Sequence, residues 1–247
     1  MSQTLVKICG IQSLEDLQMA AEAGADMLGV IFAPSKRQVD LDTAKAMGTW
    51  LRAFRTREQV NVASAPDNEP CQSTNTGWFQ DQARQLVVRS KPLLVGVFRN
   101  QPLDYIVTVA QQVPLDLVQL HGTEDLRYAQ DIPLPVIKAF HVDDTFSDLE
   151  TLGTPGFHHY ILLDAKVAGT SAQGGHGQAF DWKLTAPIKA LGHPFILAGG
   201  LRPENVRAAV TQVQPWMVDV SSGVETEGRK DRLKIQRFIK EATQREP

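Results

Sequence analysis

The chain has 247 residues, of which 43% are hydrophobic and 21% charged, and its formal net charge is −3. These ordinary globular values exclude a chain that is disordered throughout, and the slightly acidic charge argues against a protein that binds nucleic acid or membrane surfaces. No apolar run approaches the roughly 20 residues of a membrane span, and two cysteines, Cys9 and Cys71, give no disulfide framework. The N-terminus shows no secretory signal, so we expect a cytoplasmic protein.

Short apolar segments typical of buried strands alternate with helical patterns along the chain. In chain order we predict strands at Leu5–Cys9, Met27–Phe32, Leu93–Phe98, Leu117–Leu120, Val136–Ala139, Tyr160–Leu163, Phe195–Ala198 and Met217–Val220. The predicted helices are Leu14–Ala23, Leu41–Phe54, Leu103–Gln112, Asp125–Gln130, Thr145–Leu152, Trp182–Leu191, Glu204–Thr211 and Arg229–Thr243. The length would also allow two small domains, but eight strand–helix units predict an α/β fold, a single (β/α)8 TIM barrel over residues 1–247.

One polar stretch interrupts the alternation. From Thr56 to Trp78 the chain is rich in Pro, Ser and Asn and has no apolar period. We interpret 56–78 as a flexible surface insertion before the third strand. Because it joins a helix to a strand, it should enter the barrel at the end opposite to the active face; an active-site lid is the alternative.

Polar side chains cluster where the predicted strands end. The first strand ends in Cys9 and the sixth is followed by Asp164. The C-terminal ends of all the strands of a barrel open on one face, so these two proton-transfer groups should face each other across its mouth. Such a pair suits acid–base chemistry on a small molecule. The other polar residues at strand ends are Ser35, Lys36, Arg37, Arg99, Asn100, Gln119, His121 and Asp219.

The last two strands end in small residues that are typical of a phosphate site. Gly199 and Gly200 follow the seventh strand, and Ser221, Ser222 and Gly223 follow the eighth. Glycines let backbone N–H groups approach an anion closely, and the serines can open a short extra helix whose N-terminus favours negative charge. The alternative is two tight turns without a ligand.

These motifs together resemble the phosphoribosylanthranilate isomerase family of tryptophan biosynthesis, and the third-strand and C-terminal motifs are most similar to fungal members. The matching stretches are Leu5–Gly10, Val95–Asn100, Val118–Gly122, Pro135–Lys138, Leu162–Asp164, Ala198–Val206 and Val218–Glu225. They span nearly the whole chain outside 56–78. The resemblance implies an aldose–ketose isomerase that converts N-(5-phosphoribosyl)anthranilate to 1-(2-carboxyphenylamino)-1-deoxyribulose 5-phosphate by Amadori rearrangement.

The resemblance also implies roles for single residues. Cys9 matches the general base, so the barrel mouth should favour its thiolate. Asp164 matches the general acid, which must stay partly protonated, so we expect burial to raise its pKa. Arg37 matches the residue that grips the anthranilate carboxylate, with a solvated loop charge as the alternative. Asp219 and Gln119 would hold substrate hydroxyls or order the site.

His121 is open to two interpretations. It either stacks on the aromatic ring of the substrate or is a structural turn histidine. The loop after the sixth strand departs from the family, because it reads Gly174-Gly175-His176-Gly177 where members usually have a small hydroxyl residue at the position of His176. Backbone N–H groups of Gly175 and Gly177 could still contribute to the phosphate site.

Other features and interpretations compete with this assignment. His158 and His159 lack clear partners, so we expect no metal site, and no cofactor is expected. Lys138 ends the fifth strand and would suit a Schiff-base aldolase, but Cys9 would then have no step to serve. The related isomerase of histidine biosynthesis uses paired aspartates, whereas the first strand here ends in Cys9. A non-catalytic phospho-ligand barrel needs neither proton-transfer group. The expected partner is a phosphorylated small molecule, and the chain is either free-standing or fused to, or associated with, other tryptophan-pathway enzymes.

Overall fold

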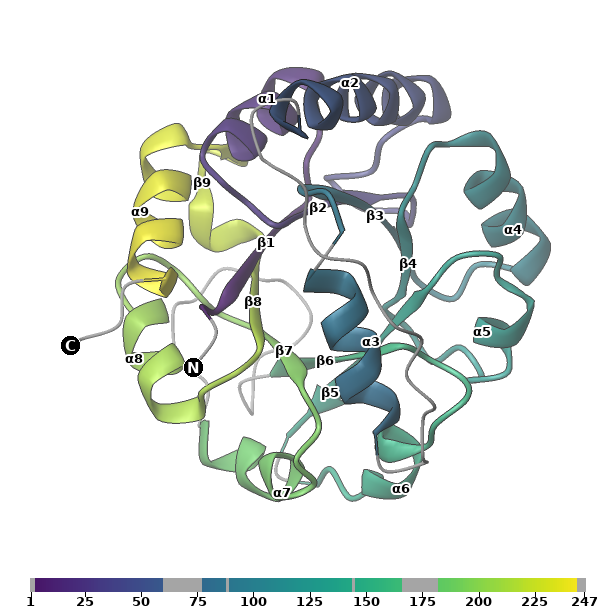
Figure 1. The fold of residues 1–247 in the computed structure, drawn as a ribbon, viewed down its shortest axis with the longest axis vertical. Coiled ribbons are helices and arrows are strands. Elements are labelled where there is room, and N and C mark those ends of the chain that lie inside the picture. The colour runs from purple at the N-terminus through teal and green to yellow at the C-terminus, as the bar shows by residue number, and fades with distance from the viewer. Residues whose placement is uncertain (1–2, 60–76, 88, 144, 166–181, 244–247) are drawn as a thin grey trace.

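The computed structural model describes residues 3–59, 77–87, 89–143, 145–165 and 182–243 (Figure 1). Eight parallel strands close into one barrel in chain order, with β8 paired back to β1. The strands are β1 (Leu5–Cys9), β2 (Met27–Ile31), β3 (Leu93–Phe98), β4 (Leu117–Leu120), β5 (Val136–Val142), β6 (Tyr160–Ala165), β7 (Phe195–Ala198) and β8 (Met217–Val220). This architecture confirms the predicted TIM barrel.

Helices surround the barrel, and a short hairpin of β9 (Glu225–Thr226) and β10 (Arg229–Lys230) follows β8 (Figure 1). The helices are α1 (Leu14–Glu22), α2 (Leu41–Gln59), α3 (Trp78–Val87), α4 (Leu103–Gln112), α5 (Tyr128–Asp131), α6 (Leu149–Gly153), α7 (Ala186–Ala190), α8 (Val206–Val213) and α9 (Arg232–Thr243), with 3-10 turns η1 (Trp182–Thr185) and η2 (Ser222–Val224). Within the described ranges, no helix has the length and apolar character needed to cross a bilayer.

The side-chain period of the strands decides which residues reach the mouth. In β1, Val6 and Ile8 belong to the core cluster between strands and helices, while Cys9 belongs to the cluster inside the barrel. Successive strand residues point to opposite faces, so Lys7 shares the inner face with Cys9. The same period continues from Leu162 to Asp164 in β6 and places that carboxyl group inside the mouth.

Helix α3 is not among the predicted elements, so the structure corrects the prediction here. Its buried residues Phe79, Ala83 and Leu86 lie four and three positions apart, which is helical spacing. The indole Nε1 of Trp78 donates to the carbonyl oxygen of His158, 3.0 Å away, just before β6 begins. The helix therefore covers the N-terminal end of the barrel, opposite to the mouth.

The predicted boundaries of the polar insertion are too wide. Helix α2 continues through Gln59, so residues 56–59 are helical, and Trp78 already belongs to α3. Arg57, Glu58 and Gln59 are good helix formers, which explains why α2 extends beyond its apolar period. Residues 60–76 lie outside the described part of the chain, and their interpretation as a surface insertion stays a prediction.

Other element ends also differ from the prediction. Strand β5 runs three residues further, to Val142, and so carries His141 to the mouth. Helix α6 begins only at Leu149, because the Asp148 carboxylate accepts a hydrogen bond from the Thr151 N–H and caps it there. The segment 229–230 forms a strand of the β9–β10 hairpin and not the start of the last helix.

Candidate active site

A cavity of about 430 Å³ opens at the C-terminal end of the barrel. It brings together all of the described residues predicted for the site except Gln119. These are Cys9, Arg37, His121, Asp164, Gly199, Gly200, Asp219, Ser221, Ser222 and Gly223. Gly175 and Gly177 lie outside the described residues, so their predicted contribution stays untested.

Cys9 ends β1 in a tightly packed position. Its side chain is 7% exposed, and it lies beside Gly29 of the neighbouring strand β2. A Cβ atom at position 29 would lie 2.8 Å from the Cys9 Sγ, so only glycine leaves the thiol its place. Gly10 follows with φ +74°, and a Cβ there would lie 2.6 Å from the Arg37 Cδ. Two glycines therefore fix the thiol and bring Arg37 close to it.

The positive charges around Cys9 lower the pKa of its thiol by less than burial raises it. Burial raises the pKa of the Cys9 thiol, the positive charges of Lys7 and Lys230 lower it, and the Asp219 carboxylate raises it again. The net direction is upward. The Lys7 Nζ is fully buried and donates to the Asp219 Oδ1, 3.0 Å away, so this carboxylate offsets much of the lysine's effect on the thiol. The prediction that the mouth favours the thiolate is wrong as a net direction, because burial outweighs the two lysines.

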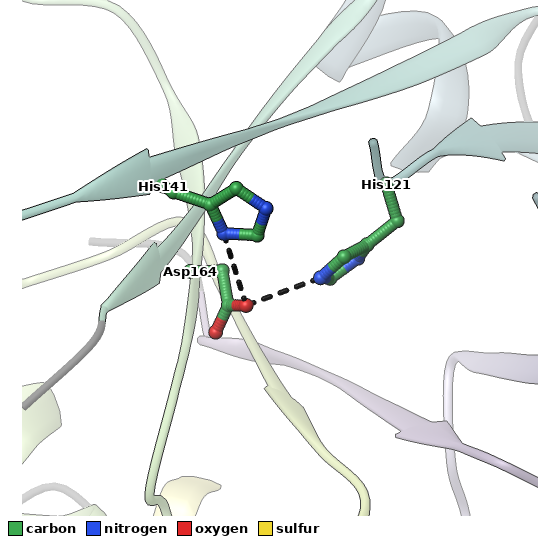
Figure 2. Close-up of side chains that lie close together, drawn as sticks. All are labelled: His121, His141 and Asp164. Carbon is green, nitrogen blue, oxygen red and sulfur yellow. Dashed lines mark hydrogen bonds and ion pairs between the residues drawn. The ribbon is translucent and has the colours of Figure 1, made fainter. Parts of the chain in front are cut away.

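Asp164 lies between two imidazoles (Figure 2). Its Oδ2 is 3.1 Å from the His121 Nε2 and 3.4 Å from the His141 Nδ1. Burial raises the pKa of Asp164, but hydrogen bonds and charge from His121 and His141 lower it more, so the net pKa lies well below the ordinary value. The prediction that burial raises this pKa is wrong as a net direction, because two neighbours stabilise the carboxylate.

Gln119 does not line the cavity but contacts His121, which does. Its side chain is fully buried, and its Nε2 lies 2.7 Å from the His121 Nδ1. Gln119 of β4 thus holds the ring of His121, which follows β4 and contacts Asp164. Of the two roles predicted for Gln119, ordering the site fits this contact, and His121 has a specific partner on each ring nitrogen.

Lys138 holds the loop that carries His121. Its buried Nζ donates to the Gly122 carbonyl oxygen at 2.8 Å and to the Glu124 Oε2 at 2.9 Å. Glu124 in turn accepts hydrogen bonds from the backbone N–H groups of Asn100 and Gly122. The ammonium group is therefore engaged in a structural network, which argues against the Schiff-base aldolase alternative.

Arg37 reaches the cavity in a fixed orientation. Its Nε and Nη2 donate to the two carboxylate oxygens of Glu225, each 2.7 Å away, and Lys230 donates to the same carboxylate at 2.7 Å. A guanidinium has five N–H donors, so within the described part of the chain three remain unused, two on Nη1 and one on Nη2. The free edge can still make a forked contact with a second carboxylate.

The loops after β7 and β8 form one wall of the cavity. Gly199 and Gly200 have φ of +93° and +62°, which glycine adopts without strain. A Cβ at Gly223 would lie 1.9 Å from the Leu201 carbonyl oxygen, so the two loops touch at this glycine. The buried Ser221 Oγ has no hydrogen-bond partner among the described residues. Such an orphaned hydroxyl on a glycine-lined wall fits an oxyanion that would bind there.

Several residues of the site are absent from the predicted set, namely Lys7, His141, Glu225 and Lys230. Lys7 could have been predicted from the sequence, because it lies two residues before Cys9 and therefore points to the same inner side of β1. For His141 the same period continues from Ala139, but the predicted strand ends at Ala139. Glu225 is 188 residues from Arg37 in the sequence, so no local pattern joins them.

Comparison with known proteins places this site in a family. A sequence model described as N-(5'phosphoribosyl)anthranilate (PRA) isomerase matches residues 52–241. An isomerase of that name from Oceanobacillus iheyensis is 38% identical, with 95% of this chain and 94% of that protein covered. The crystal structure of phosphoribosyl anthranilate isomerase from Thermotoga maritima is 35% identical with a TM-score of 0.71, covering 97% of this chain and 98% of that one.

Longer relatives also match over nearly the whole chain. A multifunctional tryptophan biosynthesis protein from Phycomyces blakesleeanus is 44% identical over 97% of this chain, which covers 33% of that protein. The chain spans about a third of the length of this and two other multifunctional relatives. Because the family's sequence model covers more than half of the chain and full-length relatives align end to end, the chain belongs to the phosphoribosylanthranilate isomerase family.

Proposed function

We propose that the chain isomerises N-(5'-phosphoribosyl)anthranilate to 1-(2-carboxyphenylamino)-1-deoxyribulose 5-phosphate by an Amadori rearrangement. The observation that carries the proposal is the shared cavity, where Cys9 and Asp164 line the same mouth together with Arg37 and the glycine loops. A phosphoribosyl anthranilate isomerase that is 34% identical, with a TM-score of 0.67, has been crystallised with the reduced form of this product. The cavity of this chain offers a place for each group of that compound.

In the proposed mechanism Asp164 donates a proton in the first step and Cys9 accepts one in the second. Asp164 gives a proton to the ribose ring oxygen, the C1'–O bond breaks, and the anthranilate nitrogen lone pair forms a C1'=N double bond. The Cys9 thiolate then removes the C2' proton, whose bonding electrons form a C1'=C2' double bond and return the lone pair to nitrogen. The enolamine becomes the ketone when the C2' hydroxyl loses its proton and C1' gains one. No atom is gained or lost overall, as an isomerisation requires.

The pKa directions place the proton on the Cys9 thiol and not on the Asp164 carboxyl group. The raised pKa of Cys9 favours the thiol, and the lowered pKa of Asp164 favours the carboxylate. The reactive form carries the same number of protons, so it arises when one proton moves from the thiol to the carboxyl group. The substrate brings two anionic groups and excludes water, and both effects raise the pKa of a nearby carboxyl group. The same two effects act on the Cys9 thiol, so the transfer also depends on the positive charges of Lys7 and Lys230, which lower the pKa of Cys9. Substrate binding promotes the acid form of Asp164, and the two lysines stabilise the thiolate.

The two anionic ends of the substrate have separate places. The phosphate would bind the wall formed by Gly199, Gly200, Ser221, Ser222 and Gly223, where backbone N–H groups and the Ser221 hydroxyl, which is unpaired among the described residues, are available. The anthranilate carboxylate would bind the free edge of Arg37. Asp219 lines the same cavity and can accept a hydrogen bond from a substrate hydroxyl while it pairs with Lys7.

A fluorescence assay tests the proposed function. Purified chain is added to enzymatically generated N-(5'-phosphoribosyl)anthranilate, and the loss of its fluorescence is followed while the product is identified by mass spectrometry and NMR. The account predicts catalytic decay and a ketose product of unchanged mass. Binding of the substrate without decay would leave a non-catalytic phospho-ligand barrel as the function. Fusion to other tryptophan-pathway enzymes, as in the fungal relatives, is a further proposal for the natural protein.

Arg37→Ala should raise KM and affect kcat far less than a change at Cys9 or Asp164. Arg37 touches no bond that is made or broken, so it binds ground state and transition state alike. A charged hydrogen-bonded contact contributes about 1.5–3 kcal/mol, which corresponds to a roughly 10- to 150-fold rise in KM. Steady-state kinetics measure the effect, and Arg37→Lys should recover only part of it because an ammonium cannot make a forked contact.

The matched control is Lys36→Ala, which removes the exposed neighbouring cation. Its KM should stay within about twofold of the wild-type value, since solvated charges contribute little. An unchanged KM in Arg37→Ala would show that another cation, such as Arg99 at the cavity wall, holds the carboxylate.

Gly29→Ala should lower kcat by roughly 10- to 100-fold, because the added methyl group displaces the Cys9 thiol, and misplacement by about 1 Å can cost 100-fold. The matched control is Gly48→Ala in α2, where the new Cβ would lie 2.9 Å from the Pro114 Cδ. That contact is as tight but lies away from the mouth, so kcat should stay within about threefold of wild type. Equal kcat values for the two variants would contradict the placement of the reactive thiol.

A further inference from the structure

Three side chains from neighbouring strands converge on one point of the mouth. His121 follows β4, His141 is in β5 and Asp164 in β6, and the register pairs His141 directly with Asp164. Figure 2 shows both imidazoles directed at the same carboxylate oxygen. The His121 Nε2, the His141 Nδ1 and an Asp164 carboxylate oxygen all lie within 4.8 Å of one another. We call these three residues the His–His–Asp cluster.

The spacing of these donor atoms fits a single metal ion. The Asp164 Oδ2 lies 3.1 Å from the His121 Nε2 and 3.4 Å from the His141 Nδ1. In a tetrahedral site with metal–ligand bonds of about 2.0–2.1 Å, neighbouring ligand atoms are roughly 3.3–3.4 Å apart. The two distances to Asp164 therefore already match those between ligands of one ion.

The surroundings of the cluster also favour a metal. The buried His141 Nδ1 lies 3.4 Å from the Asp164 Oδ2 and has no other partner within the described residues, so no group outside the cluster competes for it. Gln119 lies 2.7 Å from the other nitrogen of His121, and among the residues that the structure describes its Oε1 has no hydrogen-bond partner. An amide can turn half a turn about its last bond, so this oxygen can accept the His121 Nδ1–H and leave Nε2 free to bind an ion. Metal-bound histidines commonly have such a second partner.

Access and donor type narrow the choice of ion. The three side chains are between 24% and 30% exposed, so an ion can reach them from solvent. Two imidazoles and one carboxylate suit Zn²⁺ and related transition-metal ions, whereas Mg²⁺ prefers oxygen ligands alone. Three protein ligands leave a fourth position open, and His121 and Asp164 both line the cavity where the substrate would bind.

We propose that the His–His–Asp cluster is a binding site for Zn²⁺ or a similar divalent transition-metal ion, and that the bound ion inhibits the isomerase reversibly. The inhibition rests on the proposed function, because the ion would occupy the carboxylate that acts as the general acid. The ion would also fill the part of the mouth next to the ribose ring. Zn²⁺ should therefore compete with the substrate.

Binding is tested first, without reference to activity. Isothermal titration of the metal-free chain with Zn²⁺ should show one site that involves the cluster, and titration with Mg²⁺ should show none. His141→Gln removes one ligand and should raise the Kd for Zn²⁺ at least about tenfold. The matched control is His193→Gln, which removes an imidazole just before β7, at the opposite end of the barrel, and should leave the Kd unchanged.

Cys9 is the competing ligand in the same cavity. If Cys9→Ser abolishes Zn²⁺ binding while His141→Gln retains it, the ion binds the thiol and the cluster assignment is overturned. Circular dichroism of each variant checks that the barrel is intact. Asp104→Asn, an exposed carboxylate change in α4, serves as a further binding control.

Inhibition is tested second, with each variant compared with its own metal-free rate. Zn²⁺ should raise the apparent KM of the wild-type chain, EDTA should restore it, and His141→Gln should need at least about tenfold more Zn²⁺ for the same effect. Zn²⁺ binding to the cluster in a chain without isomerase activity would refute the proposed function and leave the metal site standing. If the chain is an active isomerase but His141→Gln leaves the Kd for Zn²⁺ unchanged, the metal site alone is refuted.

Discussion

Cys9→Ala is expected to lower kcat by about 10²- to 10⁴-fold, the usual contribution of a general base. The alanine removes only the sulfur atom from the buried position and cannot accept the C2' proton. Cys9 is the group at the end of β1 that faces the cavity, and the positive charges of Lys7 and Lys230 act on its thiolate. Turnover is measured by the fluorescence assay, and the affinity for the reduced product analogue is measured by titration.

The affinity should change little, because the base contributes to the transition state and not to ground-state binding. Cys71→Ala removes the other cysteine and should keep wild-type kcat. Activity of purified Cys9→Ala within about threefold of wild type would remove Cys9 from the mechanism.

Asp164→Asn is expected to cause a loss of similar size, about 10²- to 10⁴-fold in kcat. The amide oxygen can still accept hydrogen bonds from His121 and His141, so the shape of the cluster is retained. The amide cannot supply a carboxyl proton to the ring oxygen, so ring opening should become the slow step. Single-turnover measurements should therefore show substrate that is bound but not opened.

The exposed Asp104 in α4 provides the control for this change. Asp104→Asn removes one carboxylate of the same kind outside the cavity and should leave kcat unaltered. If Asp164→Asn turned over normally, the acid would be another group in the cavity, and Asp219 would be the first to examine.

The barrel and most of its mouth could be predicted because the relevant signals are local. Each strand is a short apolar run, and the residue at its end is polar, as in Leu162-Leu163-Asp164. Once the strands are parallel members of one barrel, their C-terminal ends must meet. The bounds of β1, β3, β4, β7 and β8 agree with the prediction for the same reason.

The protonation of the site could not be predicted because it depends on contacts between distant segments. The direction of the pKa of Asp164 is reversed by two histidines from β4 and β5, and His141 reaches the mouth only because β5 is longer than its apolar core. Burial raises the pKa of Cys9, and one of the positive charges that lower it is Lys230, which comes from the hairpin after β8. His121, His141 and Lys230 cannot be identified from the residues that flank Cys9 or Asp164.

The polar stretch after α2 shows a different limit. Its composition predicts an interruption but not where the helices on either side end. Helix α2 runs into it through Gln59, and α3 emerges from it at Trp78 because Phe79, Ala83 and Leu86 can pack against the bottom of the barrel. Tertiary packing of one apolar face, and not local propensity, determines where such a helix forms.

The most direct test of the account is a crystal structure of the chain with reduced 1-(o-carboxyphenylamino)-1-deoxyribulose 5-phosphate, the compound bound in the crystal structure of the 34% identical relative. The account predicts the C2' atom about 3–3.5 Å from the Cys9 Sγ, the distance of a reacting pair. It also predicts the ligand carboxylate on the free edge of Arg37 and the phosphate against Gly199, Gly200 and Ser221. A ligand with its phosphate at Arg37, or with C2' out of reach of Cys9, would contradict the account.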